Sequence, residues 1–523
     1  MRKLATLLLA AGLVFGFSTG ANAIDFKAKG QWIMSFDYGQ NGGFTGGNGS
    51  TGWNGKGNGG EDEFNAKQRV RLQLDAVASE ALSGTVWFEI GAQNWGKNGD
   101  GGALGADGNN AVKVKNAYID WIVPETDLKV RMGIQGMAIP SFTTGSNVFN
   151  DDVAGVTLSY QFTENVGATF FWARPWNDNF AGYEDRNGNQ TDRRQNYVDN
   201  VDAFGLLVPF TFDGVKVTPW VMYSMIGPNA WRDHSYGGNN RQYYANVTGV
   251  SRNWAGAGML PVGGAIHKDG TPSTKTLKHY GSAIWAGLTG ELTMFDPLRI
   301  AWDFNYGSVQ YSESRMNRAG WLASLLVEYK LDWGIPGIYG WYASGDDGNP
   351  ANGSERMPSL SVNNNNNGFS NFAYNGNPYI AREAILGYDM SGTWGIGARL
   401  KDMSFLEDLK HTFRVNLIGG TNSTTMTRYL GRNDDFQDYR NGANAGPAVG
   451  MQPLYMTTND YAMEIGLTNT YKMYENFTVM LDMAYLATWM DHSRKVWGNT
   501  RFNGDDDTVK DPWNINLSFV YSF

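Results

Sequence analysis

Two pairs of basic residues are each separated by one residue, a spacing that puts both members of a pair on the same face of a β-strand. They are Arg69 with Arg71 and Lys129 with Arg131. Two carboxylates, Asp151 and Asp152, follow at the end of the segment 140–153. Cations facing carboxylates across a narrow wet gap create a field that favours polar solutes. The sequence therefore predicts an electrostatic site made of Arg69, Arg71, Lys129, Arg131, Asp151 and Asp152.

A second interpretation of these charges stays open. Any wet wall of a protein carries charges of both signs, and other strand-like segments here also contain them, for example Asp75, Glu89, Asp303, Arg299, Glu464 and Asp482. Lys113 and Lys115 would enlarge the basic set, but in one regular strand their phase conflicts with that of Asp120.

Catalytic chemistry has little support. Covalent catalysis needs a nucleophile next to a base. The five histidines lie in or beside predicted loops and turns, and no predicted strand face pairs one with a serine: His234, His267, His279, His411 and His492. We expect no catalytic residue and no enzyme.

Metal binding has one weak candidate. Oxygen side chains alternate at Asp185, Asn187, Asn189 and Asp192, as in a calcium loop. The glycine of such a loop is misplaced and its bidentate glutamate is missing, so a solvated loop is the favoured interpretation. The chain has no cysteine, which excludes thiolate metal sites and disulfides. We expect no cofactor.

The residues that surround the first basic pair alternate strictly. The apolar side chains fall on one face of the predicted strand: Val70, Leu72, Leu74 and Ala76. The polar or charged side chains fall on the other face: Arg69, Arg71, Gln73 and Asp75. The same period of two recurs along the chain, as in Leu298-Ile300-Trp302-Phe304-Tyr306 and Phe477-Val479-Leu481-Met483-Tyr485. An apolar outer face with charges inside indicates a barrel with a wet lumen.

Short and long connections alternate between these segments. This predicts an all-β, transmembrane antiparallel β-barrel with short periplasmic turns and long extracellular loops. Our strand count is 18; 16 stays open because 280–293 and 381–400 have an ambiguous phase. The segment 140–153 would be a loop that folds inward and narrows the lumen.

Both ends of the chain fit this architecture. Arg2 and Lys3 precede the apolar stretch 4–17, and Ala21-Asn22-Ala23 follows. This predicts a signal peptide over 1–23 and a single barrel domain over 24–523. The last strand ends with Phe519, Tyr521 and Phe523, which is similar to the assembly signal of outer-membrane barrels. We therefore expect the bacterial outer membrane as the location and the barrel-assembly machinery as a partner.

Composition excludes other classes. The net charge of −9 argues against a nucleic-acid partner. After residue 23 no run of about 18 apolar residues remains, so transmembrane helices are not expected. Charged residues make up 18% of the chain, below the ~25% usual in soluble domains.

These features together resemble the bacterial general porins. The chain is most similar to the homotrimeric outer-membrane porins of sulfate-reducing bacteria, whose mature chains begin much like Ile24-Asp25-Phe26-Lys27-Ala28-Lys29-Gly30. Pro140-Ser141-Phe142 stands where many porins have a Pro-Glu-Phe-Gly-type motif, with Ser141 replacing the glutamate. The resemblance implies a homotrimer among lipopolysaccharide and lipid, with the loop 96–110 latching onto a neighbour. It also implies passive diffusion of small hydrophilic solutes and ions.

Two rival functions stay open. A substrate-specific channel, anion-selective through its basic residues, would be favoured by 18 strands and a continuous basic ladder. A structural or adhesive barrel with a plugged lumen would be favoured by long loops, above all 228–279.

Overall fold

The computed structural model describes residues 24–40, 63–97, 101–105, 112–177, 183–184, 190–192, 200–228, 230, 258–261, 277, 279–362, 367–377, 379–380, 384–387, 389–427, 455–491, 493, 496 and 511–523. Eighteen long strands make the wall: β1 (Asp25–Gln40), β2 (Glu63–Ser79), β3 (Leu82–Asn94), β4 (Val112–Ile122), β5 (Lys129–Ala138), β6 (Phe149–Gln161), β7 (Gly167–Asn177), β10 (Asn200–Leu207), β12 (Val215–Ile226), β13 (Gly281–Phe295), β14 (Leu298–Gln310), β15 (Arg318–Tyr329), β16 (Ile335–Ala343), β18 (Thr393–Leu406), β19 (Leu409–Gly420), β20 (Tyr461–Tyr474), β21 (Phe477–Trp489) and β22 (Trp513–Ser522).

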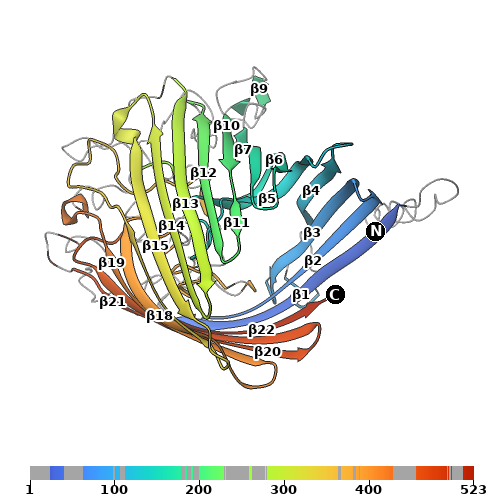
Figure 1. Ribbon diagram of the computed structural model, residues 1–523. Coiled ribbons are helices and arrows are strands. Elements are labelled where there is room, and N and C mark those ends of the chain that lie inside the picture. The colour runs from blue at the N-terminus through green and yellow to red at the C-terminus, as the bar shows by residue number, and fades with distance from the viewer. Residues whose placement is uncertain are drawn as a thin grey trace.

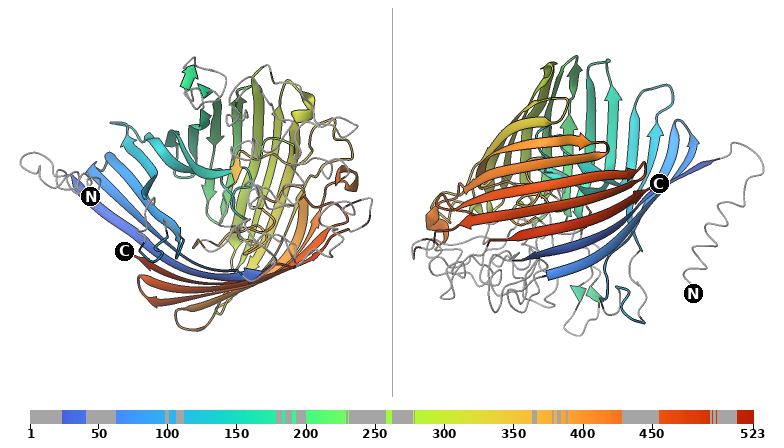
Figure 2. Two further views of the ribbon diagram at one scale, coloured as in Figure 1. Left: turned by 180° about the vertical axis from the view of Figure 1, so that it is seen from behind. Right: turned by 90° about the horizontal axis from the view of Figure 1, so that it is seen from below.

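Each of these strands pairs antiparallel with its neighbours, and the last pairs with the first (Figures 1 and 2). The β1–β22 register runs from Gln31 opposite Ser522 to Gln40 opposite Trp513. Gly30 and Phe523 exchange two backbone hydrogen bonds of 2.9 and 3.0 Å just beyond it. The predicted antiparallel barrel is confirmed, with 18 strands.

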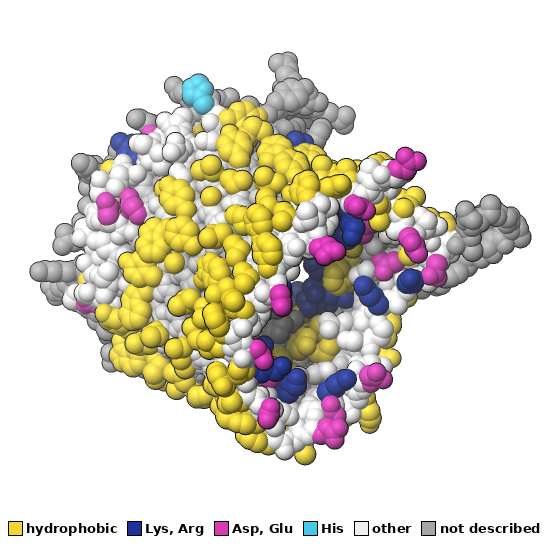
Figure 3. All heavy atoms as spheres, viewed as in Figure 1, with side chains coloured by type: hydrophobic (Ala, Val, Ile, Leu, Met, Phe, Trp, Pro, Cys, Tyr) yellow, Lys and Arg dark blue, Asp and Glu magenta, His cyan; other side chains and the backbone are white. Residues whose placement is uncertain are grey.

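The two faces of the wall differ as the alternation predicts. On β14, Phe304 and Tyr306 are exposed on the outside while Asp303 and Asn305 are buried inside. Apolar side chains cover the outer surface in Figure 3. A closed barrel with an apolar outer belt satisfies its backbone groups within lipid. This is the architecture of bacterial outer-membrane proteins, so the predicted location is confirmed.

No helix within the described ranges is long and apolar enough to cross a membrane.

The connections differ in length between the two ends of the barrel. At the end that holds the termini they are short turns, such as Asp213-Gly214 between β11 (Phe210–Phe212) and β12, where Gly214 has a φ of 69°. The long connections at the other end contain the small elements β8 (Tyr183–Glu184), β9 (Gln190–Asp192), β17 (Ser361–Val362), η1 (Ser314–Met316) and η2 (Thr424–Met426).

A β-bulge in β4 removes the phase conflict found in the sequence. Trp87 of β3 pairs with Asn116, but Phe88 pairs with Val114, so Lys115 is an extra residue on β4. A bulge re-aims the side chains on one side of it. The side chains of Lys115 and Asp120 can therefore both lie on the inner face of the barrel. In a regular strand they would lie on opposite faces.

Several predicted features lie outside the described residues. These are the signal peptide 1–23, most of the loop 228–279, and the calcium candidate, of which Asp185, Asn187 and Asn189 are not described and the side chain of Asp192 is not either.

Candidate functional site

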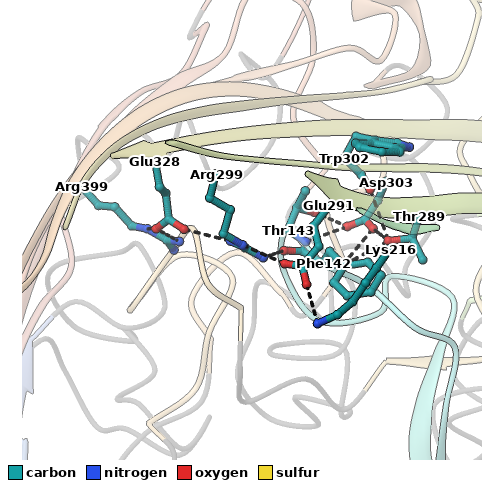
Figure 4. Close-up of polar contacts among 10 residues, drawn as sticks. All are labelled: Phe142, Thr143, Lys216, Thr289, Glu291, Arg299, Trp302, Asp303, Glu328 and Arg399. Carbon is teal, nitrogen blue, oxygen red and sulfur yellow. Dashed lines mark hydrogen bonds and ion pairs between the residues drawn. The ribbon is translucent and has the colours of Figure 1, made fainter. Parts of the chain in front are cut away.

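The loop after β5, here named L3 (residues 139–148), enters the barrel and reaches the wall of β13–β15, bypassing β7, β10 and β12. Asp303 of β14, 4% exposed, receives it. The Ser141 hydroxyl donates to Asp303 at 2.6 Å, and the Phe142 and Thr143 backbone N–H groups donate at 3.1 and 3.2 Å. The hydroxyls of Thr143 and Thr289 donate to the same carboxylate (Figure 4). One buried carboxylate thus anchors L3 across the lumen.

Ser141 has a clear role at the place where it replaces the glutamate of the porin motif. It acts as a hydrogen-bond donor. The carboxylate is on the wall, at Asp303. The sequence offered Asp303 only as one of several wall charges, and nothing in its local pattern pointed to a partner 162 residues away.

The inward loop is shorter than the predicted segment 140–153. β6 begins at Phe149, because Ala138 of β5 already pairs with Asn150. Asp151 and Asp152 therefore belong to the wall and do not face the cations across a gap. Asp152 contacts Lys115 and accepts a hydrogen bond from Asn116 at 2.9 Å.

A second loop, here named L7, also enters the lumen with its described residues, which are 344–362, 367–377, 379–380, 384–387 and 389–392. Ser370, Asn371 and Phe372 all donate to Glu464 of β20, at 2.9 to 3.0 Å. Asn371 also donates to Asp482 of β21 at 2.8 Å. Within L7, β17 pairs in parallel with the start of β6. L7 therefore spans the interior from β16 to β20 on one side and β6 on the other.

L7 brings its own apolar contacts into the barrel. Phe369 stacks on Tyr339 of β16 with ring centroids 4.2 Å apart. Phe369, Phe372 and Tyr374 are fully buried. From the sequence we predicted only long extracellular loops, and these aromatic residues were the signal that could have shown that this one enters the lumen.

We distinguish two parts of the inner wall. We name the inner face of β14–β22 the covered wall; there Asn416, Glu464 and Asn516 hydrogen-bond to L7 and are 0% exposed, while Arg299 is 30% exposed. We name the inner face of β2–β5 the open wall. There Arg71 is 24% exposed and Arg131 41%.

The open wall carries a basic cluster around Trp87. Arg71 contacts Glu89 at 2.8 Å, whereas Arg69 reaches the same carboxylate only at 4.0 Å. The Nε of Arg69 is buried and has no hydrogen-bond partner among the described residues. Arg71 and Lys115 lie 5.8 and 5.1 Å from the centre of the Trp87 ring, within cation–π range. The structure thus brings the predicted pair Arg69 and Arg71 together with Lys115.

The second predicted basic pair is split. Arg131 donates twice to Asp120, at 2.6 and 2.9 Å, and lies 4.2 Å from the Tyr118 ring. Lys129 is exposed at the first residue of β5, next to the short turn. Arg131 is therefore neutralised by its neighbour, and Lys129 stands apart from the basic cluster. Figure 3 shows a hollow where Lys and Arg side chains gather, with Asp and Glu side chains around it.

Comparisons with known proteins find only distant likenesses. No protein-family model matches the chain, and no curated protein sequence matches it. Among solved structures it is similar to OpdQ of Pseudomonas aeruginosa, at 10% identity and a TM-score of 0.47 over 96% of this chain and 99% of that one. It is also similar to the outer membrane protein OprD of P. aeruginosa, at 10% identity and a TM-score of 0.48 over 97% of this chain and 95% of that one. The third structure is OccAB3 of Acinetobacter baumannii, at 10% identity and a TM-score of 0.46 over 95% of this chain and 100% of that one. These likenesses are too distant to carry a functional argument, and the resemblance to porins of sulfate-reducing bacteria stays a prediction.

Proposed function

We propose that the chain is an outer-membrane channel that selects small polar solutes by charge as they pass along the open wall. The observation that carries this proposal is the anchoring of L3 on Asp303. With L3 and L7 on the covered wall, the charged side chains of β2–β5 line the remaining path.

The charges of the open wall support a preference for anions. Arg69 and Arg71 share the single carboxylate of Glu89, so one positive charge is left over beside Trp87. A surplus charge on a confined wall raises the local concentration of its counter-ion. Binding must stay weak, because a conducted solute also has to leave. These features favour a substrate-selective channel over a general porin.

A general porin is the second candidate, and the balanced pair Arg131 and Asp120 favours it, because a neutralised pair discriminates little between ions. Planar bilayers with the purified protein separate the candidates. We expect an anion-selective reversal potential in a KCl gradient, and a conductance that saturates as a small carboxylate is added. A linear conductance without ion preference would favour the general porin. No conductance at all would favour the plugged structural barrel.

The proposal extends to the assembled protein. We propose a homotrimer in a membrane with lipopolysaccharide, inserted by the barrel-assembly machinery. Phe519 and Tyr521 lie on the outer face of β22, and a Cβ on Gly30 would lie 2.4 Å from the Phe523 ring, so this terminus packs at the closure of the barrel. Transport down a gradient needs no cofactor and no catalytic residue.

A further inference from the structure

A row of side chains crosses the covered wall at one level. Arg299 of β14 is opposite Glu328 of β15, which is opposite Gly337 of β16, which is opposite Arg399 of β18. A Cβ on Gly337 would lie 3.0 Å from the Cγ of Glu328. The absence of a side chain at Gly337 therefore lets Glu328 extend over β16 toward Arg399.

Glu328 binds both arginines of this row. Arg299 donates to one of its oxygens at 2.8 Å, and Arg399 donates twice to the other, at 2.6 and 3.1 Å (Figure 4). Glu328 is 7% exposed. This buried carboxylate orients Arg399, and it orients Arg299 together with Glu291 of β13, which accepts a hydrogen bond from the Arg299 Nε at 2.9 Å.

Each arginine uses a further N–H on a different loop. Arg299 donates to the Phe142 carbonyl of L3 at 2.9 Å, and Arg399 donates to the Gly368 carbonyl of L7. The two loops also touch, because a Cβ on Gly368 would lie 3.1 Å from the Thr143 carbonyl oxygen. Glu328 thus binds the two arginines that hydrogen-bond to the backbones of L3 and L7 at the place where the loops meet.

We propose that Glu328 is a positioning residue that fixes L3 and L7 relative to each other. The pair of loops, and neither loop alone, then sets the width of the path along the open wall. Among the described residues, Asp303 binds L3 and Glu464 binds L7. The Leu360 N–H of L7 also donates to the Val148 carbonyl at the end of L3, at 2.8 Å. Glu328 supplies a second link between the loops, at Phe142 and Gly368. This inference rests on the proposed channel function for its conductance readout, but not for its structural one.

The structural test uses the absence of cysteine in the chain. Spin labels at Thr144→Cys in L3 and Asn375→Cys in L7 report the distance between the loops by double electron–electron resonance. We expect one narrow distance distribution in the otherwise unchanged protein and a clearly broadened one with Glu328→Gln. The control Asp75→Asn removes an open-wall carboxylate whose side-chain hydrogen bonds within the described ranges go to Gln73 and Thr85, and should leave the distribution narrow. An unchanged distribution with Glu328→Gln would overturn the inference even if the barrel conducts nothing.

The functional test measures coupling. Asp303→Asn, Glu464→Gln and their combination are compared by single-channel conductance, with and without Glu328→Gln. With Glu328 present, the two changes should combine non-additively, because each loosened loop also releases the other. With Glu328→Gln the departure from additivity should shrink, and the single Glu328→Gln variant should conduct about twofold more than the parent. Additivity in both backgrounds, or an equal departure from additivity in both, would contradict the coupling.

A milder variant guards against misfolding. If Glu328→Gln does not give a heat-modifiable barrel on gels, Arg399→Lys replaces it in the test. The lysine keeps the positive charge but cannot bind Glu328 and the Gly368 carbonyl at once, because it has no planar guanidinium group. It should broaden the distance distribution in the same way. A narrow distribution with a folded Arg399→Lys variant would count against the proposal.

Discussion

The covered wall and the open wall contain the same residue types but use them differently. On the covered wall, Asp303 and Glu464 accept hydrogen bonds from backbone N–H groups of L3 and L7. On the open wall, Glu89 and Asp120 bind the arginines beside them. A luminal carboxylate can thus hold a loop or neutralise a cation. Charge on the inner face of a barrel is therefore not in itself a sign of selectivity.

The difference has a simple origin in the partners available. Backbone N–H groups brought in by a loop need acceptors once they are buried, and the covered wall supplies them. Among the described residues, L3 and L7 make no hydrogen bond to β2–β5, and Arg71 and Arg131 remain partly exposed. Selectivity should depend on the open wall, and pore width on the covered wall.

The largest expected effect comes from Asp303→Asn. The change removes the charge that accepts the donors of L3, and hydrogen bonds to a charged group are worth ~1.5–3 kcal/mol each. We expect L3 to leave the wall and single-channel conductance to rise several-fold. Asp75→Asn is the matched control, because it removes a luminal carboxylate that binds the strand residues Gln73 and Thr85 and no described residue of a loop. Equal conductance for both variants would break the distinction between the walls.

Charge reversal on the open wall should change ion preference more than conductance. Arg69→Glu combined with Arg71→Glu turns the surplus positive charge beside Trp87 into a negative one. We expect the reversal potential in a KCl gradient to move toward cation selectivity. The glutamine pair at the same positions should give an intermediate shift, which separates charge from size. If the reversal potential stays the same, the basic cluster has no part in selectivity.

Trp87→Ala should have a smaller effect. Each cation–π contact contributes ~0.5–1 kcal/mol at a partly exposed site, and two cations would lose it. We expect Arg71 and Lys115 to become more mobile and the anion preference to fall by less than the arginine changes produce. The change in anion preference is measured by comparing the conductance with chloride and with a larger organic anion. A stronger effect than that of the arginine pair would assign selectivity to the ring itself.

The smallest effect is expected at Glu355 of L7, whose carbonyl accepts a hydrogen bond from Ser344 just after β16. Partial burial raises the pKa of Glu355, and the neighbouring carboxylates Asp347 and Asp346 raise it further, against the Asp347 N–H hydrogen bond that lowers it. A carboxyl with a raised folded pKa lowers stability as the pH rises from the unfolded pKa to the folded one.

Glu355→Gln should therefore flatten the slight loss of thermal stability above the ordinary pKa of 4.5, without changing conductance. Melting curves of the parent and the variant at several pH values check the first point. A variant whose melting temperature falls with pH as steeply as that of the parent would contradict the assignment.

Strand periodicity predicted most of the barrel. The alternation around Val70 and Leu72 has one physical cause, lipid on one side and water on the other, so it is visible locally. The bulge at Lys115 was not predicted, because an extra residue in one strand shows only once its partner β3 is known.

The site was predictable in part. The spacing of Arg69 and Arg71 placed both on one face, and the structure keeps them together. The course of L7 could not be read from its sequence, since its Asn and Gly content is also typical of a solvated loop. Asp303, Glu328 and Glu464 act through partners more than 70 residues away, and strand periodicity gives no information about such pairs.

The central claim is that solutes pass along the open wall and not the covered one. Cysteines introduced into this cysteine-free chain test it directly: Gln73→Cys beside Trp87 on the open wall, and Ser518→Cys, fully buried on β22. A charged methanethiosulfonate reagent is added during bilayer recording. We predict a fast, lasting drop in current with Gln73→Cys and none with Ser518→Cys. Fast block at Ser518→Cys with an unaffected Gln73→Cys would contradict the account.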